Sequence, residues 1–519
     1  MRDQLPCLDA EFESRRRTHA PLLRHFDLRR MIERRLNLDR GEIRKVPALG
    51  LPPATTSDLR RLHASHVSIP HTIWRRCGTL IRMDRRNFIA CLTATAATAR
   101  RLNAASTPRI AASTIQGHIE ALSVFGRPAG GSFQHGVSRI GYSDADIAGR
   151  KFVMDLMKKA GASVRIDAAG NIFASLPGSD PSLPPLLFGS HIDSVPSGGN
   201  FDGDLGSLAA VQILQLFNDL RMPTRRPLTA VVWACEEASF AGASLNGSRI
   251  AAGKAKPEEL TQVSRGLTKA EAIQRIGGDP SRIETARISP GTYHAYIELH
   301  IEQGGTLARD GVPVGVVDGI VSIDHYDVTI TGFANHAGTT PMPVRQDALI
   351  AAASLTLAVR EIVVAEPGAQ VGTVGHLEVT PNAVNVIPGE VRMNIELRDL
   401  SSAKLQRLAE RIKARAAAIA SQTRTDIRIT SAGHSESAVA APEVQRAIEA
   451  AANKLHLDSR HLPSGAGHDA QMMATVMPMG MIFVPSVAGI SHSPKELTSW
   501  QDCANGANML LETVLDLSR

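Results

Sequence analysis

Two stretches of the sequence decide the fold: LLFGSHID at residues 186–193 and LTAVVWACEE at residues 228–237. Each is apolar along most of its length and then ends in histidine or acidic residues. A continuous apolar run is typical of a strand in a sheet that is covered on both faces. Ligands of open α/β sheets bind beyond the carboxyl ends of such strands. The two stretches therefore predict an α/β fold whose functional side chains follow the strands.

Side chains that can bind metal recur at these predicted strand ends. His191 closes the first run, Glu236 and Glu237 close the second, and His300 follows a third strand-like run at residues 295–299. Neighbouring residues of an extended chain face opposite ways. One acid of the Glu236–Glu237 pair can therefore bind metal while the other meets the reacting water.

Two loops supply further candidate ligands. Asp202 lies in the Gly-rich turn GGNFDG, where glycine lets the backbone approach a metal closely, and one carboxylate can bridge two cations. His492 lies in GISHSP near the C-terminus. Asp193, two residues after His191, points to the same side of an extended chain and could orient that imidazole.

Each of these residues alone also has an ordinary structural interpretation. A single histidine after a strand is more often part of the core, and an adjacent acid pair is more often solvated. Several such residues at strand ends, flanked by Gly-rich loops, favour a metal site. Spacing alone leaves both interpretations open.

The formal charge of +6 belongs to one end of the chain. Residues 1–86 carry 19 Lys and Arg against 10 Asp and Glu, whereas the rest carries 38 against 41. We therefore expect no nucleic-acid partner, since a basic face with stacking aromatics is missing from the pattern. No apolar run approaches the ~20 residues of a membrane span, and five cysteines without a Cys-x-x-Cys spacing favour neither disulfides nor a thiolate site.

The N-terminal segment has two open interpretations. The sequence MDRRNFI from Met83, followed by a mildly apolar stretch, resembles a twin-arginine export signal. Such a signal functions only at an N-terminus, so it would direct a periplasmic protein only if translation began at Met83. Otherwise the Arg-Arg pair is a chance feature of an Arg-rich leader and the protein is cytoplasmic. In both cases we expect residues 1–112 to be a poorly ordered extension without chemistry.

Residues 320–432 have the pattern of an inserted domain. The expected order β-α-β-β-α-β is ferredoxin-like, with Ser401 as a helix cap. Its expected elements are residues 321–331, 346–365, 371–379, 384–397, 401–421 and 426–430. We expect the catalytic domain to consist of residues 113–319 and 433–519, with a mixed sheet flanked by helices.

The chain resembles the hydantoinase/carbamoylase amidases from about Gly117 to its end. This family includes N-carbamoyl-L-amino-acid hydrolases, allantoate amidohydrolases and β-ureidopropionases, and it lies within the zinc aminoacylase/carboxypeptidase superfamily. The motifs that carry the resemblance are GSHIDS at 189–194, FDG at 201–203, ELHIEQG at 298–304, NHAGTTPM at 335–342, PNAVNVIPG at 381–389 and GAGHDA at 465–470.

The resemblance implies a di-metal, aminopeptidase-like catalytic domain and an inserted domain that serves as dimerisation unit and lid. Two divalent ions (Zn, Mn, Co or Ni) would be held in each subunit of a homodimer, with Asp202 bridging them. The implied ligands are His191, Asp202, Glu237, His300 and His492.

The resemblance also implies roles beyond the ligands. Glu236 would be the general base, and His336 would stabilise the oxyanion in the partner subunit's site. Three residues would contact substrate, namely Gln303, Asn385 and Arg398, and His468 lies in a loop that contacts substrate in the family. One departure is that many relatives have EEGSRF where this chain has EEASFA at 236–241.

The resulting prediction is hydrolysis of the carbamoyl C–N bond of an N-carbamoyl-L-amino acid. Allantoate and β-ureidopropionate remain open as substrates, because they offer the same ureido and carboxylate groups. An aminoacylase or peptidase of the superfamily, a non-catalytic ligand-binding protein and a nucleic-acid role for the leader are the more distant alternatives.

Overall fold

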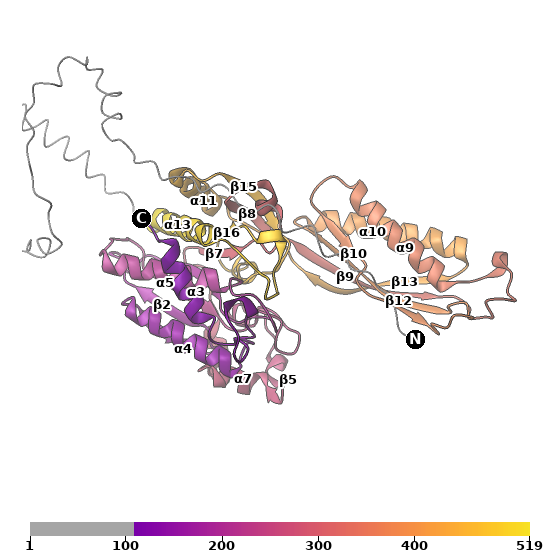
Figure 1. Cartoon of the computed structure of the whole chain (residues 1–519), viewed down its shortest axis with the longest axis horizontal. Helices are drawn as coiled ribbons and strands as arrows, with labels where there is room; N and C mark the ends of the chain where they lie inside the picture. The colour runs from indigo at the N-terminus through magenta and orange to yellow at the C-terminus, as the bar shows by residue number, and fades with distance from the viewer. Residues whose placement is uncertain (1–107) are drawn as a thin grey trace, which may run out of the picture. The chain divides into compact units, whose positions relative to one another are not determined.

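The computed structural model describes residues 108–519, which form two large sheets with their helices and one short two-stranded hairpin (Figure 1). The predictions for residues 1–107 of the leader, including the twin-arginine signal from Met83 and the disorder of its residues, lie outside the described range. Residues 108–112 were also expected to be poorly ordered, but Ile110 is buried and Arg109 Nη1 donates to Glu512 Oε1 at 2.6 Å, so the ordered part of the chain begins before residue 113. The limits of the three folded segments stay predictions.

The catalytic domain contains a nine-stranded mixed sheet in the order β1-β2-β4-β3-β7-β16-β8-β14, with β15 paired to β8. Its strands are β1 (Ser163–Ile166), β2 (Ile172–Leu176), β3 (Leu186–His191), β4 (Leu228–Trp233), β7 (Tyr296–Ile301), β8 (Val314–Ile320), β14 (Ala438–Val439), β15 (Ser459–Ser464) and β16 (Met479–Val484). A separate short hairpin joins β5 (Val263–Ser264) to β6 (Leu267–Thr268). The central strands β4, β3, β7 and β16 are mutually parallel, so their carboxyl ends meet at one edge of the sheet.

Helices cover both faces of this sheet, as the continuous apolar runs predicted. Its helices are α3 (Ala112–Leu122), α4 (Asp144–Lys159), α5 (Asp204–Asp219), α6 (Asn246–Ala251), α7 (Lys269–Arg275), α8 (Thr306–Asp310), α11 (Pro442–Leu455), α12 (Asp469–Met473) and α13 (Trp500–Leu517). Leu186 and Phe188 of β3 pack in the core under α3, α4, α5, α11 and α13. Leu187, which points the other way, packs with α6, α8 and α12.

The inserted domain has its own antiparallel sheet in the order β10-β12-β9-β13, which confirms the ferredoxin-like prediction. Its elements are β9 (Ser322–Thr331), α9 (Ala348–Ala365), β10 (Val371–Thr373), β11 (Leu377–Thr380), β12 (Glu390–Asp399), α10 (Ser402–Thr423) and β13 (Asp426–Ser435). The Ser401 side chain caps α10 by accepting the amide of Lys404. We call residues 322–435 the lid.

Two predicted strands of the lid differ from the structure. Residues 371–379 form two short strands that both pair with β12, rather than one. Residues 384–389 are a loop, and β12 begins only at Glu390. Pro381 precedes this loop and Pro388 lies within it, and proline has no N–H to donate to a sheet ladder.

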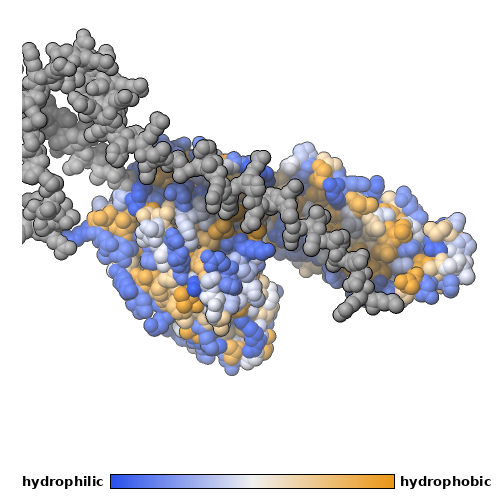
Figure 2. Space-filling model, in the orientation of Figure 1, coloured by the Kyte–Doolittle hydropathy of each residue, from blue (hydrophilic) through white to orange (hydrophobic). Residues whose placement is uncertain are grey.

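The lid exposes apolar side chains on α9. Ile350, Leu357 and Val364 are 55%, 63% and 70% exposed and recur every seven residues, so they lie on one face of the helix. Figure 2 shows hydrophobic surface on the lid among hydrophilic atoms. α9 is long and apolar enough to cross a membrane, although no membrane span was predicted from the sequence. Its opposite face packs in the core of the lid. One face of α9 is therefore apolar and exposed to solvent.

A charged cluster lies where the lid strands β9 and β13 meet the catalytic domain. His434 Nδ1 lies 2.6 Å from Asp324 Oδ1, and its Nε2 lies 3.0 Å from Glu436 Oε1. Hydrogen bonds to these two carboxylates raise the pKa of His434. The Ser322 hydroxyl also donates to the Ser435 carbonyl here.

Candidate metal centre

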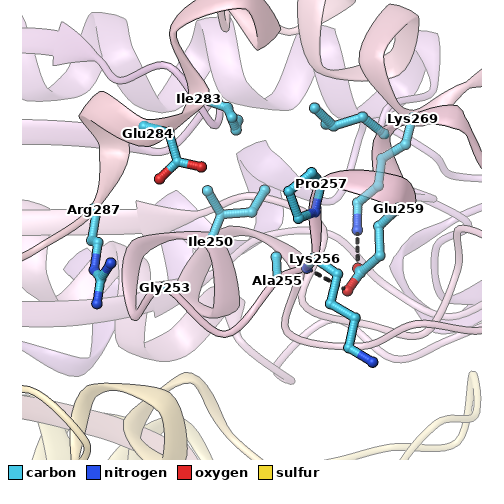
Figure 3. Close-up of a pocket in the computed structure, with 11 residues that line it drawn as sticks. Ile250, Gly253, Ala255, Lys256, Pro257, Glu259, Lys269, Ile283, Glu284 and Arg287 are labelled. Carbon is cyan, nitrogen blue, oxygen red and sulfur yellow. Dashed lines mark hydrogen bonds and ion pairs between the residues drawn. The ribbon is translucent and has the colours of Figure 1, made fainter.

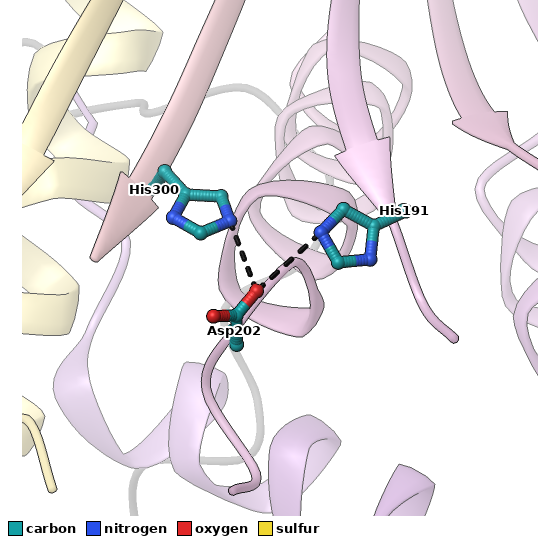
Figure 4. Close-up of side chains that lie close together, drawn as sticks. All are labelled: His191, Asp202 and His300. Carbon is teal, nitrogen blue, oxygen red and sulfur yellow. Dashed lines mark ion pairs between the residues drawn. The ribbon is translucent and has the colours of Figure 1, made fainter. Parts of the chain in front are cut away.

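The first candidate metal-binding group joins residues from two strands and one loop (Figure 4). His191 Nε2 lies 3.5 Å from Asp202 Oδ1, and His300 Nε2 lies 3.2 Å from the same oxygen. These three residues form one of the groups that could hold a metal ion. His191 is the last residue of β3 and His300 lies within β7, so the parallel strands bring both imidazoles to one edge.

The second group uses the other oxygen of the same aspartate. His492 Nε2 lies 3.6 Å from Asp202 Oδ2 and 3.3 Å from Glu237 Oε1. Asp202, Glu237 and His492 again form a group that could hold a metal ion. The structure thus brings all five predicted ligands together, and Asp202 turns one carboxylate oxygen toward each group. This is the arrangement that a bridging carboxylate needs.

The Gly-rich turn explains how Asp202 reaches this position. Gly203 has a φ of 66°, and a Cβ there would overlap the imidazole of His191. Gly203 is also the N-cap of α5, which starts at Asp204. Only glycine adopts this left-handed backbone freely and leaves room for the ring.

Glu236 is buried beside the cluster, and its carboxylate makes no hydrogen bond within the part of the chain that the structure describes. The carboxylate is close to His191, with 3.9 Å between Glu236 Oε2 and His191 Nε2. Burial raises the pKa of Glu236 well above its usual range, and Glu237 raises it further, although His191 opposes both effects. A carboxyl group in this environment can take up a proton near neutral pH.

Asp193 supports the site differently from the prediction. Its main-chain carbonyl, not its carboxylate, lies within hydrogen-bonding distance of His191 Nδ1, at 3.0 Å against 3.8 Å. The carboxylate instead accepts the amides of Glu236 and Glu237, at 2.9 and 3.2 Å. The chain leaves β3 at His191, so the alternation expected of an extended strand no longer applies at Asp193.

The donor set fits divalent cations. Further buried carboxyl groups surround the five ligands and Glu236, namely Asp193, Glu298, Asp469 and Glu496. Burial raises the pKa of Asp193 to about 7, because removal from water disfavours the charged form. Gln303 Oε1 is also buried and has no hydrogen-bond partner among the described residues. Cations bound by imidazole and carboxylate would compensate this concentration of acid.

Two of the predicted substrate residues lie at the cluster. Gln303 Nε2 donates to Asp202 Oδ2 at 2.6 Å. His468 is buried with its ring centroid 4.5 Å from that of His300, and its Nε2 lies 2.9 Å from Ser464 Oγ. His468 therefore packs behind a candidate ligand.

The other predicted residues belong to the lid. Arg398 Nε donates to Glu396 Oε1 at 2.7 Å, and its Nη1 donates to the Gly465 carbonyl at 2.6 Å. His336 and Asn385 are exposed, and His336 Nδ1 accepts the Gly338 amide at 2.9 Å. Among the described residues, no hydrogen bond or ion pair joins the side chain of His336 or Asn385 to the candidate ligands of the same chain.

The departure from EEGSRF places a large side chain in the core behind the acid pair. Phe240 is 1% exposed and packs edge-on against Tyr142, with ring centroids 5.4 Å apart. In this chain the Phe240 ring therefore fills the interior behind Glu236 and Glu237.

Sequence reasoning missed Glu496, which is buried between two loops of the site. Its Oε1 accepts the amides of Phe201 and Asp202, and its Oε2 accepts the Ser491 hydroxyl. The available signal was its place four residues after His492, on the same loop.

A cavity of about 190 Å³ lies elsewhere, among the segments that follow β4 (Figure 3). Glu259 in its wall accepts from Lys269 at 2.9 Å and from Arg249 at 2.6 Å. The lining contains none of the candidate ligands, so this cavity is separate from the metal centre.

Comparisons with known proteins agree with the geometry. Residues 187–516 match the family model described as peptidase family M20/M25/M40. An N-carbamoyl-L-amino acid amidohydrolase of Geobacillus stearothermophilus is 40% identical over 387 residues, which cover 74% of this chain and 94% of the relative. A ureidoglycolate hydrolase of Arabidopsis thaliana is 34% identical, covering 80% and 89%. The crystal structure of a hydantoinase/carbamoylase family amidase from Burkholderia multivorans has a TM-score of 0.74 and 32% identity, covering 80% and 99%.

Proposed function

We propose that this chain, which belongs to the hydantoinase/carbamoylase amidases of peptidase family M20/M25/M40, hydrolyses the carbamoyl C–N bond of an N-carbamoyl-L-amino acid. That the chain is an amidohydrolase acting on C–N bonds follows from its family. The observation that carries the metal-dependent chemistry is the pair of candidate metal groups that share Asp202 beside the buried Glu236. The choice of substrate is supported by the 40% identity to the N-carbamoyl-L-amino acid amidohydrolase of Geobacillus stearothermophilus.

The two groups would each hold one divalent ion. His191, His300 and one oxygen of Asp202 would form the first site, and Glu237, His492 and the other oxygen the second. Bound ions would polarise the carbonyl group and make water a better nucleophile near neutral pH. Imidazole and carboxylate ligands accept Zn, Mn, Co or Ni, so the donor set supports each of these metals.

Glu236 is the residue that moves protons. Its carboxylate takes a proton from the attacking water and delivers it to the nitrogen that leaves. The amino acid is released as the C–N bond breaks, and the carbamate that remains decomposes to ammonia and carbon dioxide. Burial supports this role, because it brings the carboxyl group toward the proton affinity that such a shuttle needs.

Substrate binding is assigned to residues around the cluster and on the lid. Arg398 would bind the substrate carboxylate through its guanidinium, and Gln303 and Asn385 would contact the rest of the molecule. His336 would donate to the oxyanion in the partner subunit's site. This accords with its exposure and with its Nδ1 accepting the Gly338 amide, which leaves the proton of the neutral ring on Nε2.

The proposed assembly is a homodimer formed through the lid. The exposed apolar face of α9 supports it, because such a face is usually covered in the working protein. A twofold axis would place the same face of α9 on both sides of the interface.

The strongest alternative substrate is another ureido carboxylate. The similarity to a ureidoglycolate hydrolase favours a small ureido acid, and allantoate and β-ureidopropionate present the same two groups. An aminoacylase activity would instead be expressed on N-acetyl amino acids.

A substrate panel with Glu236→Gln as control tests the proposal. The metal-loaded protein should release ammonia from N-carbamoyl-L-amino acids faster than from allantoate, ureidoglycolate or β-ureidopropionate, and should leave N-acetyl amino acids intact. Glu236→Gln should keep its metal and lose nearly all turnover, since an amide cannot carry the proton. More than about a tenth of wild-type turnover would remove Glu236 from this role.

A further inference from the structure

The Glu496 carboxylate links two loops of the candidate metal centre that are distant in sequence. Its Oε1 accepts the main-chain amides of Phe201 at 2.9 Å and Asp202 at 3.1 Å. Its Oε2 accepts the hydroxyl of Ser491 at 2.8 Å. The side chain is almost fully buried, at 4% exposed, so these contacts are not shared with bulk solvent.

Ser491 and Gly199 complete the link. The Ser491 hydroxyl lies 2.9 Å from Asp202 Oδ2, the oxygen that faces the second candidate group. A Cβ on Gly199 would overlap the Glu496 carboxylate, so glycine at this position makes room for it. Glu496 therefore fixes the backbone of Asp202 directly. The Ser491 hydroxyl lies within hydrogen-bonding distance of both carboxylates and donates its one proton to either of them.

We propose that Glu496 is a positioning residue that sets Asp202 between the two groups of candidate ligands. This inference rests on the proposed metal-dependent function. Asp202 belongs to both groups, so a shift of its carboxylate changes both. His492 and Glu496 share one loop, so the same contact also ties that loop to the Gly-rich turn. Residues that orient metal ligands in this way typically affect metal affinity 10–100-fold when replaced.

Two substitutions at this position separate the hydrogen bonds of the Glu496 side chain from its negative charge. In Glu496→Gln the amide oxygen can still accept the two amides, and the amide nitrogen can donate to Ser491, so the bracing is kept. In Glu496→Ala all three contacts are lost. The matched control is Asp347→Ala, because Asp347 likewise holds two main-chain amides, at the start of α9 in the lid.

The experiment titrates zinc alone, and manganese alone, into metal-free full-length protein by calorimetry with chelator competition. We expect two ions per wild-type chain, affinity at least about tenfold weaker in Glu496→Ala, and affinity within about threefold of wild type in Glu496→Gln and Asp347→Ala. Ammonia release by each metal-saturated variant is measured alongside. We expect Glu496→Ala to lower kcat and leave KM near that of the wild type.

The outcomes are distinguishable. Unchanged zinc and manganese affinity in Glu496→Ala would overturn the positioning role while leaving the proposed function intact. Equal loss of affinity in Glu496→Ala and Asp347→Ala would also overturn it, since the effect would then reflect general destabilisation. A wild-type chain that binds neither metal would refute the proposed function itself.

Discussion

Replacing Arg139 by methionine should destabilise the protein by about 4 kcal/mol at pH 7. Arg139 is 1% exposed and lies beneath the metal centre. Its guanidinium forms a buried ion pair with Asp204, the first residue of α5. It also donates to the carbonyls of Leu122 at 3.1 Å, Phe125 at 2.9 Å and Ile192. The residue thus ties the ends of α3, β3 and α5 together.

The magnitude comes from two contributions. Burial raises the pKa of Asp204 to about 6, and Arg139 keeps it from rising further. Without Arg139 the carboxyl group takes up a proton, and holding that proton at pH 7 costs roughly 1 kcal/mol, because pH 7 lies about one unit above the pKa of Asp204 in the wild type. Three carbonyl groups also lose their donor, at about 1 kcal/mol each. The total agrees with the ~3–5 kcal/mol expected when one partner of a buried ion pair is removed.

Urea unfolding followed by circular dichroism measures this loss. The pH dependence has a definite sign: Asp204 protonates more easily at lower pH, so the deficit of Arg139→Met should shrink by about 1 kcal/mol between pH 7 and pH 6. The double variant Arg139→Met/Asp204→Asn should be more stable than Arg139→Met by about 1 kcal/mol at pH 7, because no carboxyl group is then left to protonate. Lys158→Met, at an exposed site, should change stability by less than about 0.5 kcal/mol. A deficit below about 1.5 kcal/mol for Arg139→Met, or one that grows as pH falls, would refute the reasoning.

Three further predictions concern the lid and the assembly. Below pH about 6.5 the melting temperature of the wild type should exceed that of His434→Gln, and the difference should shrink as the pH rises through the raised pKa of His434, because the stabilising charge is then lost. Differential scanning fluorimetry measures both melting temperatures, and a difference that widens with pH would contradict the prediction. Leu357→Glu should convert dimers to monomers in sedimentation velocity, whereas Glu361→Gln on the same helix should not; a monomeric wild type would count against the proposed interface. Mixing inactive His336→Ala and Glu236→Gln subunits should restore about a quarter of wild-type activity, since half of randomly formed dimers contain one complete site, and absence of rescue would assign His336 to its own chain or to no catalytic role.

The sequence was informative wherever a signal is local. The strand preceding His191 and the acid pair after β4 could be identified from runs of eight to ten residues, because burial on both faces leaves a continuous apolar pattern. The order of strands and helices in the lid could also be predicted, because helical and extended periodicities alternate along its sequence.

Contacts between distant segments could not be predicted in this way. Glu496 meets Asp202 across 294 residues, and nothing in the spacing of either loop specifies that partner. Arg139 likewise meets Asp204 across 65 residues. The role of the Asp193 carbonyl was missed for a different reason, because the chain turns at the end of β3 and the alternation of an extended strand no longer holds.

The order in which the chain leaves the ribosome bears on when the metal centre can form. His191 and Asp202 emerge early, whereas His492 and Glu496 belong to the last thirty residues, together with α13, which packs in the core of the same sheet. The lid is synthesised between them and has a hydrophobic core of its own. A nascent chain could therefore complete the lid before the catalytic sheet receives its final strand and helix. Premature termination near the end would leave a chain that keeps four of the five candidate ligands but lacks His492, Glu496 and the helix α13 that covers the sheet.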